Sequence, residues 1–142
     1  MLANLETAPR WMGTTLTLAG IYNLVWGTLV ILWPHQTLQW FQYPPQPLPQ
    51  LWQCIGMIVG VYGIGYLAAA RAPLIHWPVV LVGFLGKIFG PIGFVDAAVR
   101  GVLPWSAGWV NLTNDVIWWL PFGLILWRAW QFHHREAASS RN

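Results

Sequence analysis

The sequence is poor in charge and has a single cysteine. Only 8% of its 142 residues are charged, whereas about a quarter are charged in an ordinary soluble domain. Because Cys54 stands alone, an internal disulfide, a CxxC redox pair and a cysteine-ligated zinc site are excluded. Only four residues are acidic, so the net charge of +3 reflects scarce carboxylates more than a basic patch. The charge balance therefore gives no reason to expect nucleic acid as a partner.

The chain is rich in apolar residues instead. Hydrophobic residues make up 56% of it, and twelve residues are tryptophan. A globule of this size cannot bury so much apolar surface, since small domains leave much of their surface exposed. A lipid bilayer is the natural solvent for such a chain, so the composition predicts a single membrane domain over residues 1–142. The first ten residues lack the pattern of a signal peptide, and we expect the first helix to be retained.

The apolar runs predict an all-α fold, a bundle of four transmembrane helices. About twenty apolar residues cross the hydrocarbon core of a bilayer, and runs of that length recur along the chain. Proline-bearing or polar segments separate them, including an interfacial loop at 34–50 and a polar tail at 131–142. The predicted helices cover residues 11–33, 51–70, 74–99 and 109–130.

The arginines predict the orientation of this bundle. Basic residues mark the cytoplasmic face of membrane proteins. Arg100 alone falls on one side of the predicted bundle. The other side carries the remaining arginines, which are Arg10, Arg71, Arg128, Arg135 and Arg141. We therefore expect both termini to be cytoplasmic, and tryptophans near the ends of the runs form the two interfacial belts that such spans require.

Glycines recur at helical spacing in the second and third predicted helices. Small residues on one face of a helix let a neighbouring backbone approach closely in a bilayer. We expect these glycines to lie at helix–helix contacts: Gly56, Gly60 and Gly63 in the second helix, and Gly83, Gly86, Gly90 and Gly93 in the third.

One lysine and one aspartate interrupt the apolar runs of the third and fourth helices. A charge at such a depth costs several kcal/mol unless it is paired or hydrated. Counting the helical rise places Lys87 roughly 10 Å and Asp115 roughly 9 Å below the outer edge of the hydrocarbon core. Asn23 and Tyr62 fall close to this depth in the first two helices, and Asn114 adjoins Asp115. The sequence therefore predicts a polar layer in the outer half of the membrane.

Three interpretations of this layer remain open. Lys87 and Asp115 can form a buried ion pair that fixes which helices meet. The layer can instead line a ligand pocket or proton path, since ionisable residues inside a membrane are candidates for function. The third interpretation is an accidental exposure of the charges to lipid.

Catalytic and metal-binding patterns are missing from the sequence. No serine–histidine–aspartate set, nucleotide-binding loop or pair of catalytic carboxylates can be assembled. His133 and His134 are adjacent, but no carboxylate cluster or cysteine accompanies them, and we interpret them as part of a solvated tail. We therefore predict that the protein is not an enzyme and has no cofactor and no metal site.

Several strings together resemble a family of small bacterial four-helix integral membrane proteins. They are IYNLVWG (21–27), WQCIGMIVGVYGIGY (52–66), HWPVVLVGFLGKIFGPIGF (76–94), LPW (103–105) and LTNDVIWWLPFGLIL (112–126). The four-span layout is also similar to that of DoxX-like proteins. Members of the family often carry the name alkyl hydroperoxide reductase. The activity that this name denotes resembles that of a thioredoxin-like enzyme with two reactive cysteines. The resemblance implies a bacterial cytoplasmic membrane and assigns no catalytic residue.

These observations predict a small integral membrane protein that binds or carries a small ligand at the polar layer. The ligand classes we expect are an anion, a quinone-like molecule and a lipid. The alternative is an accessory or structural subunit that docks on a larger membrane complex, and a membrane enzyme using Lys87 and Asp115 is less favoured. Expected partners are therefore the bilayer itself and either another membrane protein or a second copy of the chain.

The orientation can be tested with reporter fusions. We expect a reporter at the C-terminus to report cytoplasm and one inserted in the 34–50 loop to report the exterior, because the arginines gather on one side of the bundle. Activity of an exterior-specific reporter at the C-terminus would reverse the orientation and every depth derived from it.

Overall fold

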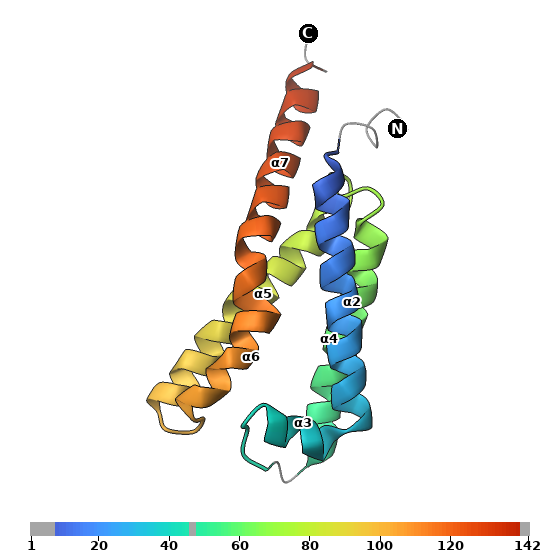
Figure 1. Cartoon of the computed structure of the whole chain (residues 1–142). Helices are drawn as coiled ribbons and strands as arrows, with labels where there is room; N and C mark the ends of the chain where they lie inside the picture. The colour runs from blue at the N-terminus through green and yellow to red at the C-terminus, as the bar shows by residue number, and fades with distance from the viewer. Residues whose placement is uncertain (1–7, 46–47, 140–142) are drawn as a thin grey trace.

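The structure, a computed structural model, describes residues 8–45 and 48–139, and within these ranges it contains helices and no strand. Figure 1 shows long helical segments and a short helix, α3, at one end of the molecule. The elements are α2 (Arg10–Leu32), α3 (Pro34–Trp40), α4 (Pro49–Ala69), α5 (Trp77–Val99), the 3₁₀ turn η1 (Trp105–Gly108), α6 (Trp109–Asn111), the π-helical turn η2 (Leu112–Val116) and α7 (Ile117–Ser139).

Among the described residues, three helices are long and apolar enough to cross a membrane: α2, α4 and α5. Both ends of α2 and α4 lie within two residues of the predicted bounds. The predicted start of α5 at Leu74 is wrong, because the helix begins at Trp77 with Pro78 in its first turn. Proline is favoured there, since its missing N–H would have no partner in a first turn anyway.

The fourth predicted span differs from a plain helix. It is divided into α6, η2 and α7, with the π-helical turn at the polar residues Asn114 and Asp115. The predicted end of the fourth helix at residue 130 is wrong, because α7 continues through the described part of the polar tail to Ser139. The extra turns contain glutamine, arginine and alanine, which favour helix. The last part of the predicted tail, 140–142, lies outside the described residues.

The segment after α2 folds back against α4. Pro34 starts α3, which turns the chain directly after the membrane-length helix. Thr37 is fully buried, and its hydroxyl accepts a hydrogen bond of 3.0 Å from the Trp52 indole N–H. An aromatic cluster forms around this contact, with Phe41 stacked on Trp26 at 5.8 Å between ring centroids. The predicted loop at 34–50 is therefore partly an ordered helix docked on α2 and α4.

The helices α2 and α4 run antiparallel and side by side (Figure 1). Small residues seven positions apart meet in three pairs along this contact, Gly13 with Ala70, Gly20 with Gly63, and Gly27 with Gly56. A Cβ placed on Gly27 would lie 2.5 Å from the Gly56 carbonyl oxygen, which is too close for any side chain. The α2 glycines were missed from the sequence, although their heptad spacing was visible there.

Only part of the predicted glycine set lies at helix contacts. Gly56 and Gly63 meet α2, a Cβ on Gly83 would overlap Tyr66, and one on Gly90 would lie 3.2 Å from Asp115 Oδ2. Gly60 also lies at the α2–α4 contact, because a Cβ on Gly27 would lie 3.1 Å from the Gly60 backbone nitrogen. The expectation was wrong for Gly86 and Gly93, where an added Cβ would meet nothing within 4 Å. The reason is that α5 diverges from α4 and runs beside α6 and α7 instead (Figure 1).

Two clusters hold the helices together at opposite ends. The first lies at the end where α2 begins and α7 finishes and joins all four long helices through Leu16, Tyr66, Val80 and Phe122. The second is largely aromatic and joins α2, α3 and α4 at the other end, where Val110 of α6 also contributes. Figure 1 shows the α5–α7 pair diverging from the α2–α4 pair toward this second end.

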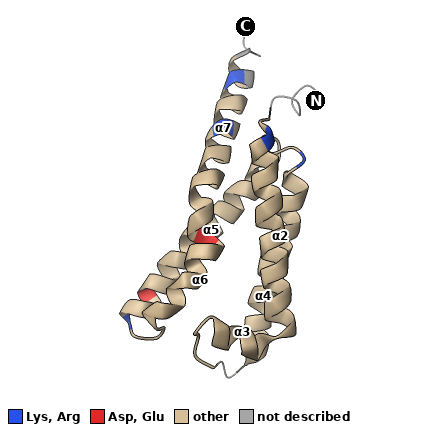
Figure 2. Cartoon of the chain, viewed as in Figure 1, with Lys and Arg blue, Asp and Glu red and all other residues tan. Residues whose placement is uncertain are grey.

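The charges follow the predicted distribution. Figure 2 shows the basic residues gathered where α2 begins, α4 finishes and α7 finishes, while one basic residue lies at the opposite end. Asp96 and Arg100, four residues apart near the end of α5, form an exposed ion pair of 3.0 Å. Arg141 lies outside the described residues.

The crossing of α2 and α4 can be tested by adding one methyl group. We expect Gly27→Ala to lower the free energy of unfolding by about 1–3 kcal/mol, because the backbones must separate to admit the Cβ. Gly93→Ala is the matched control and should be neutral or stabilising by up to ~1 kcal/mol, since its Cβ has open space and alanine favours helix. Unfolding in detergent measures both. Equal stability of the two variants would contradict the close crossing.

Candidate functional site

All five residues of the predicted polar layer line one cavity of about 190 Å³. They come from α2, α4, α5 and η2 and are Asn23, Tyr62, Lys87, Asn114 and Asp115. Three of their side chains are almost completely buried, with exposed fractions of 3% for Asn23, 4% for Lys87 and 6% for Asp115. The residues that the helical rise predicted at one depth therefore lie side by side in the structure.

A direct ion pair, one of the three open interpretations, does not form between Lys87 and Asp115. No distance of 4.0 Å or less joins the Lys87 ammonium nitrogen to a carboxylate oxygen of Asp115. The Lys87 ammonium instead donates a hydrogen bond to the backbone carbonyl of Asn114. The Asp115 carboxylate accepts one of 3.0 Å from the Asn114 side-chain amide. Asn114 thus contacts both charges, which share the cavity without touching.

The irregular backbone around Asn114 explains why a carbonyl of this turn accepts from Lys87. In the π-helical turn η2 the hydrogen-bond pattern of an α-helix is interrupted, as is common at functional sites. Two side chains donate hydrogen bonds to carbonyls of this turn. Lys87 donates to the Asn114 carbonyl, and the Trp118 indole N–H donates to the Thr113 carbonyl at 3.2 Å. Irregular backbone at membrane depth is tolerated only where protein groups or a cavity satisfy it.

A second interruption lies opposite, in α5. Pro91 has no N–H, so the carbonyl of Lys87 four residues earlier loses its helical partner. The indole N–H of Trp119 on α7 donates to that carbonyl at 2.9 Å. Each interrupted helix therefore supplies the donor that the other lacks, and these two hydrogen bonds lock α5 against the η2–α7 segment.

A larger cavity of about 320 Å³ adjoins the first and shares Val59, Gly86, Asn114 and Asp115 with it. Its wall is aromatic and includes Trp26, Tyr43, Trp52 and Phe94. Three glycines of α5 also line this cavity: Gly86, Gly90 and Gly93. The cavity accounts for the open space beside Gly86 and Gly93.

Tyr43 lies between α3 and α4, outside the long helices. Burial raises the pKa of its phenol, and the charge of Asp115 raises it further. Sequence reasoning missed Tyr43, together with Trp26, Tyr66 and Asn111, as lining residues. Their positions depend on the fold-back of α3 and on the π-helical turn, neither of which has a clear sequence signal.

Four buried polar atoms in the described part of the chain have no hydrogen-bond partner among the protein groups. They are Asn23 Oδ1, Trp26 Nε1, Asn111 Nδ2 and Asn114 Oδ1. Buried polar groups are nearly always paired in native proteins, so each exception calls for an explanation. All four side chains line one or both of the two adjoining cavities.

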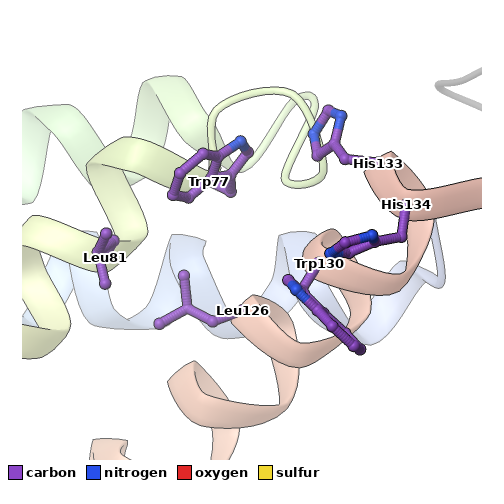
Figure 3. A pocket seen from close by; sticks show the side chains of 6 residues that line it. All are labelled: Trp77, Leu81, Leu126, Trp130, His133 and His134. Atoms are coloured by element: carbon purple, nitrogen blue, oxygen red, sulfur yellow. The ribbon is translucent and has the colours of Figure 1, made fainter. Parts of the chain in front are cut away.

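A separate hollow lies at the end where α7 finishes (Figure 3). It has a volume of about 320 Å³ and is lined by Trp77, Leu81, Leu126, Trp130, His133 and His134. The two histidines are held in place, since His133 Nε2 lies 2.9 Å from the Leu74 carbonyl oxygen and His134 packs on Trp130. No group of three histidine, cysteine or acidic residues in the described segments could hold a metal ion.

The fold and the site define a class of protein but no family. The described chain is all-helical, and its three apolar helices of membrane-spanning length are those expected of a membrane protein. No protein-family model, no curated protein and no solved structure matches the chain.

The reciprocal hydrogen bonds between α5 and α7 can be tested by a double-mutant cycle. We expect Trp119→Phe to destabilise the protein by about 1–3 kcal/mol, because the Lys87 carbonyl is left unpaired. Pro91→Ala restores a backbone N–H for that carbonyl, so the cost of Trp119→Phe should fall by about 1 kcal/mol or more in this background. Unfolding in detergent measures each variant.

Trp127→Phe changes a half-exposed ring on the same helix, so it serves as the control for that cycle and should change stability little. Identical costs of Trp119→Phe with and without Pro91 would show that the proline and the indole are not coupled.

Proposed function

We propose that the chain is an integral membrane protein with four spans that binds a small amphipathic ligand in the two adjoining cavities. The fourth span is the stretch from α6 through α7, which runs beside α5 (Figure 1). An even number of spans agrees with the beginning of α2 and the end of α7 lying at the same end of the molecule. The basic residues at this end favour a cytoplasmic location for it.

The observation that carries the proposal is the concentration of unpaired polar atoms around the cavities. Leaving a buried donor or acceptor without a partner costs about 1–3 kcal/mol. A layer that only fixed the register of the helices would be more stable with its hydrogen bonds completed. Four such atoms beside two adjoining cavities are therefore the arrangement expected of a binding site.

Lys87 gives this site its strongest donor. Its ammonium group has three N–H donors, and Asn114 accepts one of them. The others are available to an acceptor in the cavity that Lys87 lines. An anion, a quinone-like carbonyl and the headgroup of a lipid all carry such an acceptor.

An accessory subunit of a larger membrane complex is the alternative function. The apolar side chains exposed on α4 and α5 would serve a protein partner, but contact with lipid accounts for them equally well. Ligand binding has the additional support of the buried unpaired atoms, and we therefore favour it.

Mass spectrometry of the protein released from mild detergent tests the proposal. We expect a small molecule to remain bound to the parent protein and its occupancy to fall about tenfold or more in Lys87→Met, because a charged hydrogen bond is lost. Arg100→Met, which removes an exposed cation, is the matched control and should retain the molecule. A parent protein that carries nothing, or a defined assembly with another protein, would favour the subunit.

Asn23→Leu separates binding from folding. It removes a buried acceptor that has no partner, so the ligand-free protein should keep or gain stability while occupancy falls. Full occupancy in a stable Asn23→Leu variant would show that the ligand does not reach this layer.

A further inference from the structure

The unpaired atoms around the cavities are a mixture of donors and acceptors. Trp26 Nε1 and Asn111 Nδ2 are donors in the larger cavity, whereas Asn23 Oδ1 is an acceptor in the smaller one. Asn114 Oδ1, a second acceptor, lines both. A carboxylate or phosphate group offers acceptors only, and an ammonium group offers donors only. A hydroxyl group offers both, so several hydroxyls on one headgroup would satisfy this mixed set.

The charges of the site point the same way. Lys87 and Asp115 carry opposite charges and line the same small cavity. A ligand with a net charge would be attracted by one of them and repelled by the other, and it would also lose its hydration on burial. A neutral polar headgroup avoids this repulsion and can still accept from Lys87 and donate to Asp115.

Aromatic rings provide the apolar part of the site. Trp26 and Trp52 are each 8% exposed and line the larger cavity together with Tyr43 and Phe94. Such rings bury a large apolar area while their polar edges stay able to form hydrogen bonds. A sugar or glycerol group has this dual character, with C–H groups on its faces and hydroxyls around its rim.

The mouths of the cavities open toward lipid. Ile58 of α4 lines the smaller cavity and is 58% exposed, and Ile55 lines the larger one and is 44% exposed. Both side chains lie on an apolar helix of membrane-spanning length. A ligand that entered between α4 and α5 could leave its apolar tail in the bilayer.

We propose that the site takes a neutral polyhydroxylated headgroup, a sugar or glycerol unit, carried by a membrane lipid. This inference rests on the proposed function and names the ligand class for the same cavities. The hydroxyls pair with Asn23, Trp26, Asn111 and Asn114, and the C–H faces lie against the aromatic wall. The lipid tail stays in the membrane beside α4.

The full chain in phosphatidylcholine nanodiscs, doped with one test lipid at a time, provides the experiment. The lipids are monoglucosyl-diacylglycerol, diacylglycerol without the sugar, and anionic phosphatidylglycerol, and mass spectrometry measures which one stays bound. We expect retention of the glucosyl lipid to exceed that of the other two about tenfold, as two further hydrogen bonds would give. Free glucose at the same concentration should not displace it.

Two tryptophan variants make the test specific. Trp26→Phe keeps the ring and removes the unpaired N–H, so retention of the glucosyl lipid should fall about fivefold. Trp40→Phe changes an exposed ring on α3 that lines neither cavity and should have no effect.

The outcomes test the class of headgroup and the existence of the ligand site separately. Preferential retention of phosphatidylglycerol, or equal retention of diacylglycerol, would overturn the neutral polyol headgroup while leaving a ligand site. Displacement by free glucose would overturn the lipid as the source of that headgroup. Loss of every lipid and of every co-purified molecule would overturn the proposed function itself.

Discussion

The need to satisfy every buried backbone polar group governs the pairing of α5 with η2 and α7. Pro91 removes one helical hydrogen bond from α5, and the π-helical turn η2 disturbs the ladder on the facing segment. In a bilayer an unpaired carbonyl costs several kcal/mol, so neither interruption is stable alone. Trp119 and Lys87 resolve both through reciprocal hydrogen bonds. The pairing of α5 with the fourth helical segment follows from this exchange.

The same exchange separates the two helix pairs. Because α5 is held against η2 and α7, it diverges from α4 along its length (Figure 1). The α2–α4 pair is closed by its own heptad of small residues and cannot widen to fill the space. Gly86 and Gly93 of α5 then face a cavity. The α2–α4 pair and the α5–α7 pair are therefore joined at one end, and the two polar cavities lie between them toward the other end.

The sequence predicted those features that depend on counting residues. Apolar length located α2, α4 and α5, and the helical rise brought Asn23, Lys87 and Asp115 to one level. Features that depend on a local choice of hydrogen bond were missed. A π-helical turn differs from an α-helix by one residue in its bonding and has no composition of its own. The sequence therefore offers Asp115 as one partner for Lys87, whereas the ammonium group donates to the backbone carbonyl of Asn114.

The arrangement of Lys87 favours the proposed ligand site over a purely structural layer. A buried ion pair that fixes register works best when each charge touches the other and the remaining hydrogen bonds are completed. Here the ammonium group is placed on a neutral carbonyl, and the carboxylate is held by an amide of the same residue, Asn114. Neighbouring polar atoms such as Asn23 Oδ1 stay unpaired at a cost to stability. The unpaired atoms make this layer less stable than one that only fixed the register of the helices. Hydrogen bonds from a bound ligand would restore the lost stability.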